Sequence, residues 1–72
     1  MNKFLFLSEM ENAGFNSQRS FAKKANTSYK VLCNHINGVT KVSTDDVVRY
    51  CNTLNLKDPS KIINIFLCDL SP

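Results

Sequence analysis

Residues 17–38 read SQRSFAKKANTSYKVLCNHING, and this stretch predicts two short helices separated by a tight turn. Ser17 and Ser28 are preferred helix N-caps, because a serine hydroxyl accepts a hydrogen bond from a backbone N–H that has no partner in the first turn. Asn26 tolerates the left-handed conformation that a sharp turn between the helices needs. Gly38 ends the second run for the same conformational reason. The two expected helices cover residues 18–25 and 29–37.

Three further segments flank this pair, and each carries apolar residues at helical spacing next to a start or stop signal. The expected helices are residues 3–13 ending at Gly14, residues 43–54 beginning with a variant capping box of Ser43 and Asp46, and a last helix that begins at Asp58 and Pro59 and extends to Leu70. The 72 residues contain only two Gly and two Pro, too few for the many turns of a β-sandwich or barrel. We therefore expect an all-α fold of five helices in a single domain, residues 1–72.

The apolar stripes of these helices define an expected core. Seven side chains occupy inward positions and are expected to be buried together: Phe6, Met10, Phe21, Leu32, Val47, Cys51 and Leu54. Four more apolar side chains continue the same stripes: Ala13, Val31, Ile36 and Val48. His35 stands among them, and we expect it to be partly buried with a hydrogen bond to the backbone.

The positive charge of the chain is concentrated in one segment. The formal net charge is +3, but residues 16–41 contain five basic residues and no Asp or Glu. The five are Arg19, Lys23, Lys24, Lys30 and Lys41. Such a patch favours a polyanionic partner, although the same charges also fit an ordinary solvated surface, which is the better explanation for charge alone.

The sequence around the basic segment also resembles a known family. The register of Gln18, Phe21 and Ala22, Ser28, Leu32, and Asn37 with Gly38 resembles the helix-turn-helix of Cro- and cI-type phage regulators, over residues 17–56. Three residues depart from the family pattern: Ala25, Asn26 and His35. The resemblance implies a lambda-repressor-like DNA-binding domain in which residues 29–37 form the recognition helix.

The same resemblance implies roles for individual residues. Gln18 would hold a DNA phosphate at the start of the first motif helix, and Ser28 would cap the recognition helix. Tyr29, Lys30 and Asn34 would read bases, since lysine donates to guanine and asparagine pairs with adenine. Four other basic residues would supply salt-dependent attraction: Arg19, Lys23, Lys24 and Lys41.

The last expected helix is more apolar than one buried stripe requires. Six of the seven residues 62–68 are apolar. Four of them form a candidate protein interface: Ile62, Ile63, Phe66 and Leu67. Packing against the equally apolar residues 4–7 is one explanation, and contact with a second copy or another regulator is the other.

Catalysis and cofactor binding have no support in the sequence. The single His35 has no recognisable acidic partner, and the three cysteines lie far apart without metal-ligand spacing. We expect no enzyme activity, no cofactor and no metal. The apolar N-terminal run is interrupted before an export signal or a membrane span is complete, so we expect a protein of the bacterial cytoplasm.

Across its whole length the chain resembles most the modulator-of-repression proteins of temperate phages that infect Gram-positive bacteria. That resemblance implies a role in the lytic or lysogenic decision and two mechanisms. In the first, the protein is an antirepressor that binds the phage repressor. In the second, it binds operator DNA through the recognition helix, as Cro does. A homodimer is a further possibility.

Overall fold

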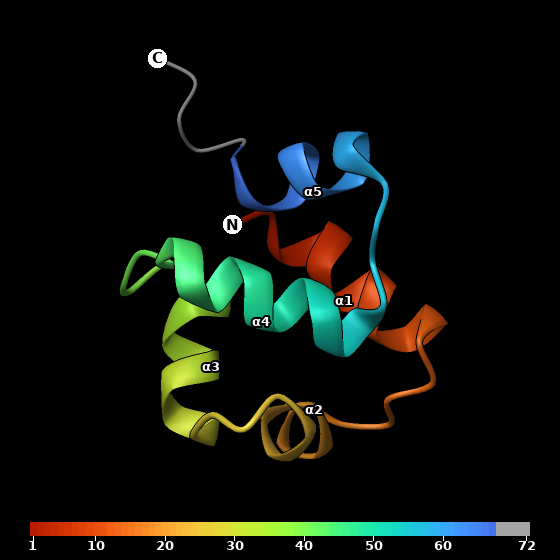
Figure 1. The fold of residues 1–72 in the computed structure, drawn as a ribbon. Coiled ribbons are helices and arrows are strands. Elements are labelled where there is room, and N and C mark those ends of the chain that lie inside the picture. Colours follow the sequence, from red (N-terminus) through yellow and green to blue (C-terminus); the bar gives the residue numbers. More distant parts are fainter. Residues whose placement is uncertain (68–72) are drawn as a thin grey trace.

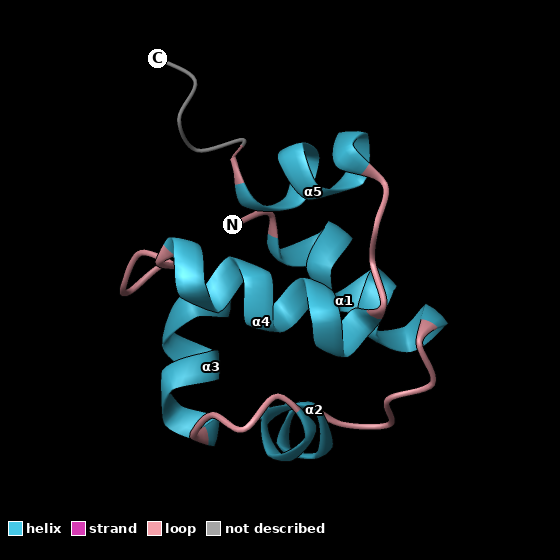
Figure 2. Cartoon of the chain, in the orientation of Figure 1, coloured by secondary structure: helices cyan, strands magenta, loops and turns pink. Residues whose placement is uncertain are grey.

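The computed structural model describes residues 1–67. Within that range the chain forms five α-helices and no strand, so the fold class is all-α as expected (Figure 2). The helices are α1 (Lys3–Asn12), α2 (Gln18–Lys24), α3 (Tyr29–Ile36), α4 (Thr44–Leu54) and α5 (Pro59–Phe66). Figure 1 shows α4 across the middle of the molecule, with α5 on one side of it and α2 on the other.

The last helix is shorter than the sequence suggests. It ends at Phe66, and Leu67 is its C-cap. Residues 68–70 of the expected helix lie outside the described residues.

The helix starts follow the predicted capping residues. The Ser17 hydroxyl accepts from the backbone N–H of Ser20 at 3.1 Å, and the Ser28 hydroxyl accepts from that of Val31 at 3.0 Å. The Asp58 carboxylate accepts from the N–H of Ser60 at 2.9 Å in front of α5. These contacts join residues only two or three positions apart, so the local sequence is sufficient to predict them.

The capping box expected at Ser43 differs in its second half. The Ser43 hydroxyl accepts from the N–H of Asp46 as expected, at 3.2 Å. The Asp46 carboxylate, however, accepts from the Ser43 hydroxyl at 3.0 Å instead of from a backbone N–H. Aspartate is one methylene shorter than the glutamate of the usual box, which is consistent with this closer partner.

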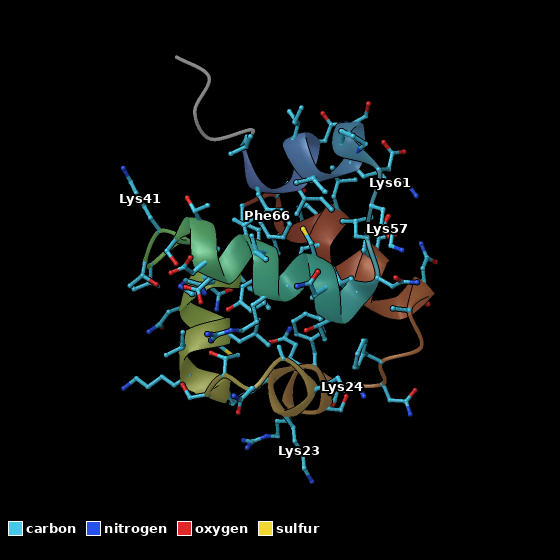
Figure 3. All side chains as sticks on the ribbon, in the orientation of Figure 1. Lys23, Lys24, Lys41, Lys57, Lys61 and Phe66 are labelled. Carbon is cyan, nitrogen blue, oxygen red and sulfur yellow. The ribbon has the colours of Figure 1, made fainter. Side chains whose placement is uncertain are left out.

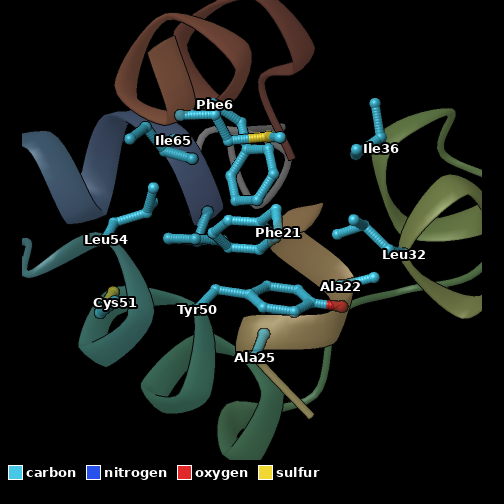
Figure 4. Close-up of a cluster of buried hydrophobic side chains, with 12 residues drawn as sticks. Phe6, Phe21, Ala22, Ala25, Leu32, Ile36, Tyr50, Cys51, Leu54 and Ile65 are labelled. Carbon is cyan, nitrogen blue, oxygen red and sulfur yellow. The ribbon is translucent and has the colours of Figure 1, made fainter. Parts of the chain in front are cut away.

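A cluster of aromatic rings occupies the centre of the molecule. The ring centroid of Phe6 lies 5.4 Å from that of Phe21, 5.7 Å from that of Tyr50 and 5.9 Å from that of Phe66. These rings come from α1, α2, α4 and α5, and Leu32 of α3 is fully buried beside them (Figure 4). Edge-to-face contacts of this kind add to the stability that burial alone provides.

Most of the predicted core is confirmed, with specific corrections. Six of the seven expected residues are buried: Phe6, Met10, Phe21, Leu32, Cys51 and Leu54. Val47 is only partly buried, and Ala13, Val31 and Val48 are exposed. The buried stripe of α4 instead includes Tyr50, which has no exposed surface. Tyr50 is three residues after Val47 and four before Leu54, so it lies on the same helical face, whereas Val48 is turned away from it.

His35 also differs from the expectation. It is 5% exposed and therefore buried, not partly buried. Its hydrogen-bond partner is the Tyr50 hydroxyl, not a backbone group. A polar side chain at this position is therefore compatible with a packed core, because its polar atoms have partners.

Candidate functional site

Helices α2 and α3 pack on each other across a very short connection. Asn26 has a φ of 57°, in the left-handed region, and the backbone N–H of Thr27 donates to the Ala22 carbonyl at 3.0 Å. The Cys33 thiol of α3 donates to the side-chain oxygen of Gln18 at 3.5 Å. The side-chain oxygen of Gln18 therefore accepts a hydrogen bond from α3. The amide N–H groups of the same side chain are the atoms that could donate to a phosphate.

One side chain from each of these helices forms a joint surface feature. The guanidinium carbon of Arg19 lies 4.2 Å from the centroid of the Tyr29 ring, which is a cation–π contact. Tyr29 is 39% exposed. A hydrogen bond with the Cys33 side chain raises the pKa of the Tyr29 phenol above its ordinary value. The contact gives two exposed groups a preformed arrangement.

The other predicted basic residues are exposed but do not form one cluster. Lys23, Lys24 and Lys30 are exposed on α2 and α3, and Figure 3 shows Lys23 projecting away from α4. Lys41 is exposed in the loop that follows α3, at the other end of that helix from Lys23 and Lys24. We use the name α2–α3 face for five residues: Arg19, Lys23, Lys24, Tyr29 and Lys30.

Within residues 1–67, no carboxylate pairs with the cations of this face. Among residues 1–67 the ion pairs join Arg49 to Asp46 and Lys61 to Glu9, and a ring nitrogen of His35 lies 3.8 Å from an Asp46 carboxylate oxygen. No member of the α2–α3 face takes part in them. A set of cations without carboxylate partners is attractive to an anionic surface.

Two predicted site residues have structural roles in addition to any contact with a partner. Ser28 caps α3 with its hydroxyl. Asn34 is partly buried, and its backbone carbonyl accepts from the N–H groups of Val39 and Thr40, at 2.9 and 3.4 Å. Both residues therefore lie at the ends of α3 and stabilise its connections.

The predicted apolar interface is only partly at the surface. Phe66 is 7% exposed and packs against the Phe6 ring, so this residue is not available to a partner. Ile62 is partly buried against the core. Ile63 and Leu67 are exposed, at 52% and 44%. The explanation that the last helix packs against the first is thus correct for Phe66, because α1 and α5 are in contact.

The sequence pattern did not predict exposed apolar residues on α1. Phe4 is 81% exposed and Leu5 is 41% exposed. The sequence does contain a signal for this exposure, since the four consecutive apolar residues 4–7 cannot all face one side of a helix. The backbone N–H of Asn2, just before α1, donates to the carbonyl of Ile65 in α5 at 2.6 Å. We use the name α1–α5 surface for four residues: Phe4, Leu5, Ile63 and Leu67.

An apolar groove of about 560 Å³ begins beside Leu67. It lies between the end of α5, the start of α4 and the loop that follows α3. Its apolar walls include Val42, Val47 and Ile62, and Lys41 stands among its lining residues. Leu67 is the residue of the α1–α5 surface that also lines this groove.

Other kinds of site find no support in the described part of the chain. Residues 1–67 contain no group of three or more His, Cys, Asp or Glu side chains placed to hold a metal ion. None of the helices in that range combines the length and apolar character needed to cross a membrane. The chain matches no protein-family model, and no match is found among curated proteins or solved structures.

Proposed function

We propose that this protein is a transcription regulator of the switch between lytic and lysogenic growth in a temperate phage, and that it acts as an antirepressor by binding the phage repressor. The resemblance of residues 17–56 to Cro- and cI-type regulators supports this class. The close packing of α2 on α3 around Asn26 is compatible with a lambda-repressor-like helix-turn-helix.

The observation that carries the antirepressor role is the exposure of large apolar side chains on the α1–α5 surface. An aromatic ring that is 81% exposed, as in Phe4, gains stability only when another molecule covers it. Aromatic and aliphatic anchors of this kind form the cores of protein interfaces. Nucleic-acid interfaces, in contrast, are polar and strongly positive. The α1–α5 surface therefore fits a protein partner better than DNA.

Calorimetry with the repressor of the same phage tests this proposal. Phe4→Ser and Ile63→Ser should each weaken repressor binding by about tenfold or more, since interface anchors contribute on the order of 2 kcal/mol. Because both side chains are largely exposed, the thermal midpoint of the free protein should stay within about 2 °C of the wild type. Val48→Ser is the matched control, because Val48 is 53% exposed on α4, outside the α1–α5 surface. Wild-type protein that fails to bind the repressor at micromolar concentration contradicts the proposal.

Operator DNA is a second candidate partner, and the α2–α3 face favours it. Its four cations have no ion-pair partner within residues 1–67, and Arg19 is held over Tyr29. Lysine and arginine side chains in such an arrangement displace counterions from DNA, which makes binding strongly dependent on salt.

A gel-shift series separates the two mechanisms. Switch-region DNA is titrated with this protein alone, with the repressor alone, and with both. A shift by this protein alone that weakens steeply with salt supports operator binding. Loss of the repressor shift on addition of this protein, without a shift of its own, supports the antirepressor mechanism.

A further inference from the structure

The buried imidazole of His35 is the centre of a chain of polar contacts between α3 and α4. Its Nδ1 lies 2.7 Å from the Tyr50 hydroxyl oxygen, and its Nε2 lies 3.8 Å from a carboxylate oxygen of Asp46. Tyr50 has no exposed surface, and Figure 4 shows its hydroxyl reaching across the core toward α2 and α3. Asp46 in turn accepts from the Ser43 hydroxyl at 3.0 Å.

The direction of the protons in this chain follows from the surroundings. Burial, and then the negative charge of Asp46, raise the pKa of Tyr50 to about 12, so the phenol is protonated at neutral pH. A neutral imidazole has one donor and one acceptor nitrogen. In the tautomer with its proton on Nε2, the His35 ring accepts from the Tyr50 hydroxyl at Nδ1 and directs its Nε2–H toward the Asp46 carboxylate. Nδ1 then has a hydrogen bond at 2.7 Å, and Nε2 has an electrostatic contact with the carboxylate at 3.8 Å.

These contacts are directional in a way that the apolar packing of α3 is not. The buried apolar side chains of this helix, Leu32 and Ile36, pack against the core through contacts that allow small rotations. A hydrogen bond weakens steeply when its angle departs from linear, so it resists rotation of the helix about its axis. His35 has partners on both sides of its ring and is the residue of α3 best suited to set that rotation.

We propose that the contacts from Tyr50 through His35 to Asp46 position α3, and through it the exposed groups Tyr29 and Lys30 of the α2–α3 face. His35 and Tyr50 are positioning residues, because both are buried and neither is available to touch a partner. The consequence for partner binding rests on the second candidate function, since it assumes that the α2–α3 face binds a macromolecule such as operator DNA. The claim that these contacts fix the rotation of α3 about its axis does not depend on that assumption.

Tyr50→Phe is the decisive variant, because it keeps the ring contacts with Phe6 and Phe21 and removes only the hydroxyl. Thr53→Val is the matched control on the same helix, since the Thr53 hydroxyl donates only to the Arg49 carbonyl within α4, at 2.8 Å. The measurement is the set of residual dipolar couplings of backbone N–H groups in α3, relative to those in α4. We expect the α3 couplings to change in Tyr50→Phe and to match the wild type in Thr53→Val. Unchanged α3 couplings in folded Tyr50→Phe overturn the proposal.

A spectroscopic measurement on the wild type keeps the test independent of any variant. Imidazole ¹⁵N chemical shifts near neutral pH should show a His35 ring with its proton on Nε2 and an acceptor at Nδ1. A proton on Nδ1 of a neutral ring contradicts the assigned direction of the Tyr50 bond and with it the proposed chain.

Partner binding provides the functional arm. Where the wild type binds operator DNA or repressor through the α2–α3 face, Tyr50→Phe should bind about tenfold more weakly and Thr53→Val should bind normally. Equal binding by Tyr50→Phe and wild type contradicts the positioning role. Absence of binding by the wild type contradicts the proposed function alone, because the dipolar couplings and the imidazole shifts still decide the positioning role.

Discussion

The α2–α3 face and the α1–α5 surface belong to the same small molecule but differ in chemistry. On the first, the apolar residues Phe21, Ala22 and Leu32 are buried, and the exposed groups are mostly cationic. On the second, Phe4 and Ile63 are exposed although Phe6 and Phe66 from the same helices fill the core. Charge acts over about 10 Å at moderate salt, whereas apolar contact requires direct desolvation. The two surfaces therefore suit different partners and respond to different conditions.

The largest expected effect tests whether both surfaces depend on one core. Phe21→Ala should lower the free energy of unfolding by about 3–5 kcal/mol, because Phe21 is fully buried and contacts rings from α1 and α4. Urea denaturation followed by helical circular dichroism measures this loss. Phe4→Ala is the control and should change stability by no more than about 0.5 kcal/mol, since Phe4 is 81% exposed. Equal losses in the two variants contradict the assignment of the core.

A second prediction concerns alkaline pH and the polar centre beneath α3. The pKa of Tyr50 is raised to about 12 in the folded protein, from an ordinary value of 10. Because the folded pKa exceeds the unfolded one, the associated stability is present below pH 10 and is lost as the pH rises to 12. Two pKa units correspond to about 3 kcal/mol.

Urea midpoints of the wild type and Tyr50→Phe, compared between pH 9 and pH 12, check this effect. The wild type should lose the larger share of its stability in this range. Burial also raises the pKa of the Cys51 thiol, but both proteins contain that residue, so the difference between them isolates Tyr50. Parallel loss of stability in the two proteins contradicts the prediction.

Helix capping provides a smaller and more local comparison of the two regions. Ser28 caps α3 and Asn2 caps α1, each by accepting a backbone N–H three residues later. Ser28→Ala and Asn2→Ala should each lower stability by about 1 kcal/mol. Hydrogen exchange should accelerate most in the first turn of the helix that has lost its cap. Identical exchange changes across both helices in both variants argue against independent local caps.

Lys23→Ala should have the smallest effect on stability, and its effect on binding distinguishes the two surfaces. Lys23→Ala should leave the thermal midpoint nearly unchanged, because Lys23 is exposed. If the α2–α3 face binds DNA, the slope of log affinity against log salt should fall in magnitude by about one. Phe4→Ser should leave that slope unaltered. Lys57→Ala is the matched control, since this exposed lysine precedes α5 and lies outside the α2–α3 face.

Much of the fold follows from local sequence signals. Ser17, Ser28, Ser43 and Asp58 predicted the helix starts, and Asn26 predicted the tight turn, because capping and left-handed turns involve residues within a few positions of each other. The exposure of the basic segment could also be predicted, since lysine side chains are rarely buried. No comparable local signal identified the contact of Arg19 with Tyr29, which joins residues ten positions apart on two helices.

Which face of each helix lies inward was decided by the tertiary structure. Val48 and Tyr50 both occupy an amphipathic helix, and hydropathy favours Val48 for the core. Tyr50 is the buried one, because its ring meets Phe6 and Phe21 and its hydroxyl meets His35. Likewise Phe66 is buried and Ile63 exposed because α1 covers only one side of α5. Sequence determined where the helices of this protein begin and turn, since those interactions are local; burial and polar pairing depend on neighbours that only the packed helices bring together.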